Sequence, residues 1–206
     1  MQNFCVIGTG KRFEYFYPIF QYLIKVKTIR VNGISNRSGI FADKCKQLTN
    51  NLFNNYEKML TEIKPDIVVV LVCANQNLKI TQNILYNYNC KIFVETPLYS
   101  ANLNNLKNNN RIHILENWIY LPLEIIKKKM VESNVLGDIK EIINDHRTYE
   151  YHGIAQLRNY LNTQKYKDIK RQSHEVIFYE NNTKLIHRRP KIRNKRILIN
   201  GDKYKI

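Results

Sequence analysis

The sequence predicts an α/β fold in which a doubly wound parallel sheet is followed by a truncated α+β domain. The chain opens with an apolar segment, residues 4–7, that leads directly into Gly8-Thr9-Gly10. Residues 67–72 are an unbroken run of Val, Ile and Leu, typical of a strand buried on both faces of a parallel sheet. Segments of strand length alternate with segments of helical periodicity through the first half, which favours βα units with right-handed crossovers. We therefore expect a Rossmann-like domain over residues 1–117 and a second domain over 118–206.

Strands are expected where a short apolar segment is bounded by polar or turn residues. In the first domain they cover residues 4–7, 29–35, 66–73, 90–94 and 112–115. Helices are expected where apolar residues recur every three or four positions, as Tyr56, Met59, Leu60 and Ile63 do. These helices cover residues 14–24, 39–48, 56–63, 78–87 and 102–109, with Pro18 tolerated near the first turn of the first helix.

The second half has a different pattern. An amphipathic helix is expected over 122–133, with three consecutive lysines on its exposed face and Gly137 as a stop signal. A strand over 139–145, a helix over 152–161, a hairpin over 175–179 and 184–187, and a last short strand over 197–200 follow. The basic segment 165–196 is expected to be a solvated, partly disordered tail.

Composition narrows the class of partner. The 206 residues carry a net charge of +16, which attracts anions such as nucleotides, nucleic acids or acidic membranes. The basic residues form no single stripe with interleaved aromatics, so compositional drift toward Asn, Lys, Ile and Tyr is favoured over nucleic-acid binding. The four cysteines contain no Cys-x-x-Cys pair, which argues against a metal site and for reduced thiols in the cytoplasm. The chain opens on a strand with no charged leader, and its longest apolar run is too short to cross a membrane.

The glycine turn is the strongest functional signal. A strand that ends in Gly-x-Gly and enters a helix is the phosphate-binding turn of a dinucleotide-binding unit, because the second glycine lets the backbone approach a diphosphate at the helix N-terminus. Phe13 stands where a third glycine or an alanine allows close packing. The alternative is an ordinary turn between a strand and a helix.

The order of further motifs resembles the Gfo/Idh/MocA oxidoreductases, named for glucose–fructose oxidoreductase and inositol dehydrogenase. The resemblance covers residues 3–162. The segments that carry it are Val6-Ile7-Gly8-Thr9-Gly10, Tyr56-Glu57-Lys58-Met59-Leu60, Cys73-Ala74-Asn75, Val94-Glu95-Thr96-Pro97, Glu116-Asn117-Trp118, Val135-Leu136-Gly137-Asp138-Ile139 and Tyr151-His152-Gly153-Ile154 through Leu157-Arg158.

The resemblance implies an N-terminal domain that binds NAD or NADP and a second domain that forms the site for a small-molecule substrate and the contact of a homo-oligomer. It implies hydride transfer to or from a sugar-like or other small polar compound. The residues it assigns to the cofactor are Gly8, Thr9, Gly10 and Lys11 at the diphosphate, Cys73, Ala74 and Asn75 on the adenosine side, and Glu95 and Pro97 at the nicotinamide.

The end of the second strand bears on the choice of cofactor. It reads Ser35-Asn36-Arg37-Ser38, without the carboxylate that normally binds the ribose 2′-hydroxyl. An Arg with neighbouring hydroxyls favours a 2′-phosphate, so NADP is predicted over NAD, with Asn36, Arg37 and Ser38 as its ligands. The alternative is an exposed turn that happens to contain an arginine.

Two departures concern the chemistry. Thr96 replaces the family's Lys in Glu-Lys-Pro, so it can donate a hydrogen bond to an oxygen but cannot act as an acid near neutral pH. His152 falls on the family's catalytic His and is the candidate acid/base. The family's Asp four residues earlier is Thr148, and Glu150 or Asp145 is expected to orient His152 instead.

Other polar and aromatic side chains have less defined roles. The alternative for His152 itself is a histidine at a helix start. Tyr149 and Tyr151 are expected to line the same cleft or merely to pack. The remaining histidines are expected to be structural or exposed: His113, His146, His174 and His187. The residues after the strand over 112–115 are candidates for the pocket rim, with Trp118 first read as core: Glu116, Asn117, Trp118 and Tyr120.

The leading hypothesis is therefore an NAD(P)-dependent oxidoreductase. The alternative is a non-catalytic nucleotide-binding remnant that acts as a sensor or structural protein, favoured by Thr96, Thr148 and the short second domain. About forty residues follow the helix of His152, too few for the full second-domain sheet of the family, so either the domain is reduced to a hairpin that a partner completes or the protein is shortened and has lost turnover. A nucleic-acid-associated protein is the third and least favoured hypothesis.

Overall fold

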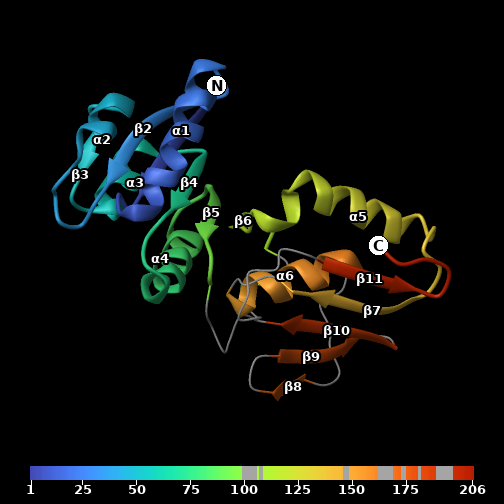
Figure 1. Cartoon of the computed structure of the whole chain (residues 1–206). Helices are drawn as coiled ribbons and strands as arrows, with labels where there is room; N and C mark the ends of the chain where they lie inside the picture. Colours follow the sequence, from blue (N-terminus) through green and yellow to red (C-terminus); the bar gives the residue numbers. More distant parts are fainter. Residues whose placement is uncertain are drawn as a thin grey trace. The chain divides into compact units, whose positions relative to one another are not determined.

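The computed structural model describes residues 1–98, 106, 109–145, 149–161, 169–172, 175–180, 182–188 and 197–206. The chain divides into two compact units, Met1–Leu115 and Glu116–Ile206 (Figure 1). The expected helix over 102–109, apart from residues 106 and 109, and three singled-out residues, His146, Thr148 and His174, lie outside the described residues. The two units are described separately below.

The first unit contains a six-stranded sheet in the order β3-β2-β1-β4-β5-β6, and every neighbouring pair is parallel. The strands are β1 (Gln2–Ile7), β2 (Ile29–Ser35), β3 (Leu52–Phe53), β4 (Ile67–Val70), β5 (Lys91–Glu95) and β6 (Ile112–Leu115). The chain runs outward from β1 through β2 to β3 and then crosses back to β4, which is the doubly wound order that the alternating pattern predicts. β4 is shorter than expected, and the two-residue strand β3 was not predicted.

Four described helices cover this sheet: α1 (Lys11–Lys25), α2 (Asp43–Leu48), α3 (Tyr56–Ile63) and α4 (Ala74–Asn87). One face of β1 packs Phe4 and Val6 with Phe13 and Phe20 of α1. The other face packs Cys5 and Ile7 with side chains from α3 and α4, among them Met59, Leu60 and Ile84. The central strand is therefore buried on both faces, as its apolar sequence requires.

The helix starts differ from the sequence prediction. α1 begins at Lys11, directly after the glycine turn, so Pro18 lies in the helix interior rather than near its first turn. α2 begins at Asp43 rather than residue 39, because Gly39 has a φ of +69°, which a helix does not permit. α4 begins at Ala74 rather than residue 78.

The second unit contains a five-stranded sheet in the order β11-β7-β10-β9-β8. Its strands are β7 (Ile139–Asn144), β8 (Ile169–Gln172), β9 (Glu175–Glu180), β10 (Thr183–Arg188) and β11 (Ile197–Gly201). β7 and β10 pair in parallel, and the other pairs are antiparallel. β9 and β10 form the antiparallel hairpin predicted over 175–179 and 184–187, and Leu185 and Ile186 are buried there. The additional strand β8 lies in the basic segment that was expected to be a tail, so for these residues the expectation is wrong.

Two helices and a short 3-10 helix complete the second unit: η2 (Trp118–Tyr120), α5 (Pro122–Glu132) and α6 (Glu150–Leu161). α6 lies along one face of the sheet (Figure 1), where Leu157 and Tyr160 pack against Ile142 of β7 and Leu185 of β10. Tyr160 donates a hydrogen bond to Glu124 of α5, and burial, followed by that bond, raises the pKa of the tyrosine. This contact joins α5 to α6.

Candidate active site

The glycine turn after β1 lies so close to the backbone that follows β4 that only glycine fits at position 8. Gly8 has a φ of +98° and donates its N–H to the Ser35 carbonyl oxygen at 2.8 Å. A Cβ built on Gly8 would lie 2.7 Å from the Leu71 carbonyl oxygen. The turn is therefore held between β2 and the segment that follows β4, at the carboxyl edge of the sheet.

The second glycine leaves open space at the N-terminus of α1. Gly10 is the N-cap residue of α1, makes no side-chain capping bond, and a Cβ built on it meets nothing within 4 Å. Thr9 is partly buried, and Lys11 begins the helix with its side chain exposed. A long helix with unpaired N–H groups facing open space fits the diphosphate of a dinucleotide.

Phe13 does not fill this space. Its side chain is 1% exposed and packs under α1, with ring centroids 6.0 Å from Phe20 and 6.2 Å from Tyr17. The residue that departs from the glycine pattern thus contributes to the core rather than covering the turn.

The Ser35–Ser38 segment forms an ordered turn at the same sheet edge. The Asn36 amide donates to Ser38 Oγ at 2.9 Å and to the Ile40 carbonyl oxygen at 2.7 Å, so both polar side chains stabilise the loop itself. Arg37 is exposed and makes no ion pair or hydrogen bond within the described part of the chain. Of the three expected ligands, Arg37 has its polar atoms available for an anion.

Cys73, Ala74 and Asn75 form the junction between β4 and α4. Cys73 is the N-cap of α4, Ala74 is the first helical residue, and Cys73 Sγ lies 2.8 Å from Asn75 Oδ1. Both side chains are exposed. Because β4 adjoins β1, this junction lies at the same edge of the sheet as the glycine turn.

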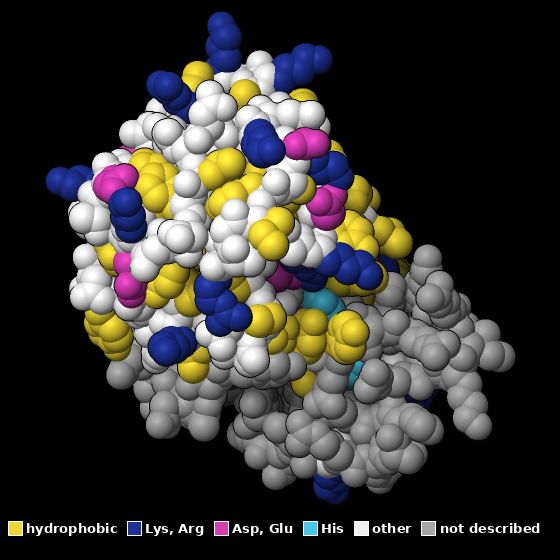
Figure 2. Space-filling view, turned by 90° about the vertical axis from the view of Figure 1, so that its left-hand side faces the viewer, with side chains coloured by type: hydrophobic (Ala, Val, Ile, Leu, Met, Phe, Trp, Pro, Cys, Tyr) yellow, Lys and Arg dark blue, Asp and Glu magenta, His cyan; other side chains and the backbone are white. Residues whose placement is uncertain are grey.

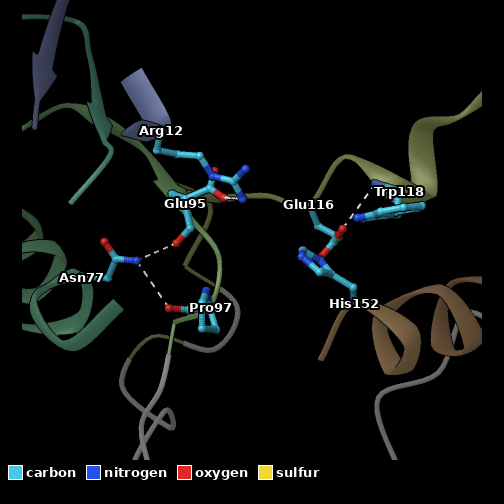
Figure 3. A network of polar contacts seen from close by, with 7 residues as sticks. All are labelled: Arg12, Asn77, Glu95, Pro97, Glu116, Trp118 and His152. Carbon is cyan, nitrogen blue, oxygen red and sulfur yellow. Dashed lines mark hydrogen bonds and ion pairs between the residues drawn. The ribbon is translucent and has the colours of Figure 1, made fainter. Parts of the chain in front are cut away.

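The Glu95–Pro97 segment is fixed by two neighbouring elements (Figure 3). Glu95, which is 5% exposed at the end of β5, forms an ion pair with Arg12 in the first turn of α1. The fully buried Asn77 of α4 donates from Nδ2 to the carbonyl oxygens of Glu95 at 2.8 Å and Pro97 at 3.4 Å. Glu95 thus links β5 to the start of α1, the helix that begins at the glycine turn.

Thr96 lies within this segment and has an unused hydroxyl. Its Oγ1 is buried and has no hydrogen-bond partner among the described residues. A buried hydroxyl without a partner is costly, and a substrate or ribose oxygen would satisfy it. This fits the hydrogen-bonding role expected from the sequence.

In the second unit, His152 is paired with a carboxylate. Its Nδ1 lies 2.6 Å from Glu116 Oε2, and both side chains are 8% exposed (Figure 3). An ionised carboxylate only accepts, so Nδ1 carries the proton in this bond. The other Glu116 oxygen accepts from the Trp118 N–H at 3.2 Å. The carboxylate is therefore oriented from both sides.

Aromatic rings surround His152. The ring centroid of Tyr151 lies 4.3 Å away, that of Trp118 6.1 Å away and that of Tyr149 6.4 Å away. Among the described residues Nε2 makes no hydrogen bond, since each polar contact of His152 involves Nδ1. The imidazole is thus held through Nδ1, with Nε2 unbonded among the described residues.

The partner of His152 was not the one expected. His152 Nδ1 bonds to Glu116, whereas Asp145 lies 3.9 Å from Arg188, and the side chain of Glu150 lies outside what the structure describes. Glu116 was considered only for the pocket rim. Its position after an apolar strand was a signal, but its pairing with a residue 36 positions later could not be inferred from spacing.

Comparison with known proteins agrees with this architecture. The model of the oxidoreductase family with an NAD-binding Rossmann fold, Gfo/Idh/MocA, matches residues 2–113. The chain therefore belongs to this family of oxidoreductases. No curated protein matches the chain.

Solved structures share the fold over the full length of the chain. Scyllo-inositol dehydrogenase from Lactobacillus casei, with bound NAD(H) and scyllo-inositol, has 12% identity and a TM-score of 0.76, covering 100% of this chain and 75% of its own. Myo-inositol dehydrogenase from Lactobacillus casei, with NAD(H) and myo-inositol, has 13% identity and a TM-score of 0.74, with coverages of 100% and 73%. An oxidoreductase from Thermotoga maritima has 17% identity and a TM-score of 0.73, with coverages of 100% and 78%.

Other kinds of site are not evident in the described residues. No group of three or more His, Cys, Asp or Glu side chains there could hold a metal ion. None of the described helices is long and apolar enough to span a membrane. Figure 2 shows the Lys and Arg side chains of one face spread singly among apolar and uncharged ones rather than gathered into a stripe.

The two glycines of the turn are expected to respond differently to the same substitution. Gly8→Ala forces a Cβ against the Leu71 carbonyl at positive φ and should destabilise the protein by at least about 2 kcal/mol. Gly10→Ala, at a φ of −78° and with open space around it, should change stability by no more than about 1 kcal/mol. It should nevertheless weaken NADPH binding by at least about tenfold, because the methyl group enters the space for the diphosphate.

Thermal unfolding and fluorescence titration with NADPH measure the two effects. Equal NADPH affinity for Gly10→Ala and the unchanged protein would show that the diphosphate does not lie on this turn.

Proposed function

We propose that this oxidoreductase is NADP-dependent and acts on a small polar, sugar-like compound, with His152 as the general acid/base. The observation that carries the proposal is the buried hydrogen bond between His152 Nδ1 and Glu116. When bound, the nicotinamide supplies or accepts the hydride at the substrate carbon. The residues of this chain bind, orient and exchange the proton that accompanies it.

The proton exchange is assigned to His152 Nε2. Glu116 fixes the tautomer with the proton on Nδ1, which leaves Nε2 to accept a proton from a substrate hydroxyl and later to return one. The imidazolium formed in this step is stabilised by the adjacent carboxylate. The arrangement has the same logic as other carboxylate-oriented histidines, in which the acid orients and the imidazole transfers.

Thr96 and Glu95 are assigned positioning roles in the first unit. The Thr96 hydroxyl can donate to a carbonyl or ribose oxygen but cannot supply an acidic proton. Glu95 is held by Arg12, which ties the end of β5 to the first turn of α1. The proton transfer that the family's lysine can serve is therefore left to His152.

The preference for NADP rests on Arg37. A guanidinium that is exposed and unpaired within the described residues favours a 2′-phosphate, and no acidic residue stands in Ser35–Ser38 to repel it. The comparisons give no support to the alternative of a non-catalytic remnant. The sugar-like substrate and a homo-oligomer stay predictions, and the inositols bound by the two structural neighbours are the first compounds to test.

Replacing Arg37 should reduce the affinity for NADPH but not for NADH. Arg37→Ser removes a charge-assisted bond to the 2′-phosphate and should weaken NADPH binding by about 10- to 100-fold. Arg30→Ser replaces an exposed arginine on β2, the strand that precedes the turn of Arg37; it is the matched control and should change neither affinity. Titration by nicotinamide fluorescence measures both, and an equal loss for the two cofactors would contradict the assignment.

Substitutions of His152 and Glu116 should lower turnover without changing the affinity for the cofactor. His152→Asn removes the proton-transferring group and should lower kcat by about 100-fold or more. Glu116→Gln keeps the shape of the side chain but removes its negative charge, so it should also lower kcat. Glu132→Gln, an exposed carboxylate on α5, is the control.

These variants are compared by steady-state kinetics with NADPH or NADP and a panel of polyols and ketoses. Turnover of His152→Asn at the unchanged rate would exclude the histidine as acid/base.

Cysteine reactivity gives an independent test of where the cofactor lies. Cys73 is exposed, whereas Cys5, Cys45 and Cys90 are buried, and burial raises the pKa of the Cys5 thiol to about 12 and that of Cys90 to about 11. At pH 8 N-ethylmaleimide should therefore modify Cys73 first, because the other three thiols are inaccessible and protonated. Saturating NADPH should slow this modification at least about tenfold, measured by mass spectrometry. Equal rates with and without NADPH would place the cofactor away from the start of α4.

A further inference from the structure

The contact between α6 and its sheet is unusually close at the point next to His152. A Cβ built on Gly153 would lie 2.2 Å from Nδ1 and 2.3 Å from Cε1 of His187, on β10. His187 is fully buried and is the register partner of Asn144 on β7. The first turn of α6 therefore lies directly on an imidazole ring that rises from the middle of the sheet.

The same turn is held by a second strand. Asn144, which is also fully buried, donates from Nδ2 to Gln156 Oε1 at 2.8 Å and to the Gly153 carbonyl oxygen at 3.5 Å. Gly153 is thus contacted through its Cα face by β10 and through its carbonyl by β7. The contact with β10 is steric, and the contact with β7 is a hydrogen bond.

The other end of α6 is held differently. Against the sheet, Leu157 and Tyr160 pack into an apolar cluster, where contacts are numerous but without direction, and the Tyr160 hydroxyl donates to Glu124 of α5 rather than to the sheet. Apolar packing alone fixes the depth of a helix less closely than a backbone that rests on a ring and accepts a hydrogen bond. The half of α6 that carries His152 is therefore the half placed most strictly against the sheet.

We infer that Gly153 and His187 form a positioning contact that sets the height of the first turn of α6 and so holds the His152 ring on Glu116. The inference rests on the proposed function of His152. With any larger residue at 153, the 2.2 Å approach falls about 1.2 Å short of an ordinary 3.4 Å contact, and α6 or His187 must move. A shift of α6 by this distance would break the 2.6 Å hydrogen bond made by the adjacent residue.

The test first introduces a steric conflict at Gly153 and then removes it by shortening His187. Gly153→Ala should raise helix propensity, so any damage it causes cannot come from the helix itself. It should abolish the low-field proton resonance of the His152 Nδ1–H bond in NMR spectra, which is identified by its loss in His152→Asn. It should also lower kcat at least tenfold, with the affinity for NADPH unchanged.

Removing the ring should rescue the variant. Gly153→Ala combined with His187→Ala has room for the new methyl group, and should regain the resonance and a kcat within about threefold of His187→Ala alone. Ala155→Gly, which alters helix propensity on α6 outside this contact, is the control. If His187→Ala is too unstable to study, His187→Ser serves in the same combination, and thermal unfolding establishes that each variant is folded.

Two results would overturn the inference: a Gly153→Ala protein that keeps the resonance, or a double variant with no recovery while folded. A failure of the proposed function is distinguishable from both. In that case the resonance would respond as expected, but His152→Asn would turn over substrate at the unchanged rate.

Discussion

The near-contact between Gly8 and the Leu71 carbonyl is the constraint on which the first unit depends. β1 and β4 are adjacent parallel strands, and the chain must leave β1 in a space too small for a side chain. Positive φ at Gly8 turns the backbone there, and α1 starts three residues later with its N-terminal N–H groups at the sheet edge. Because Gly8 has no Cβ, the chain can make this turn, and α1 with its dipole begins at the sheet edge.

The remaining segments of that edge are held by polar contacts that begin on neighbouring helices. Asn77 holds the backbone around Thr96, and Arg12 pairs with Glu95. Both contacts link the end of β5 to another element, so the residues expected to face a nicotinamide do not depend on their own loop for order. This leaves the Thr96 hydroxyl free to bond a ligand.

The sequence predicted what local pattern controls. Strands with continuous Val and Ile, the glycine turn and the α3 helix, with Asn55 accepting from the Lys58 N–H at its cap, all follow from short-range rules. β3 was not predicted because a strand of two residues is too short to show an alternating pattern of apolar and polar side chains. β8 was not predicted because its sequence is strongly basic, and a sheet forms there through pairing with β9.

The site was predicted less completely for a related reason. His152 and Thr96 could be named from motifs, but Glu116 and His187 act on residues more than 30 positions away in sequence. Such pairs are set by how α6 lies on its sheet. Local propensity does not determine that arrangement.

The exchange of the family's Asp for Thr148 bears on what the role proposed for His152 requires. An imidazole needs a carboxylate at Nδ1 with the correct distance and direction, and the element that supplies it is immaterial. Here the carboxylate comes from the segment after β6, and its second oxygen is fixed by the Trp118 N–H. A departure from a motif at one position therefore does not by itself indicate lost chemistry, provided the same charge reaches the same nitrogen by another route. The buried Glu116 satisfies that condition, and with Thr96 in place of the family's lysine the proposed proton transfer falls to His152 alone.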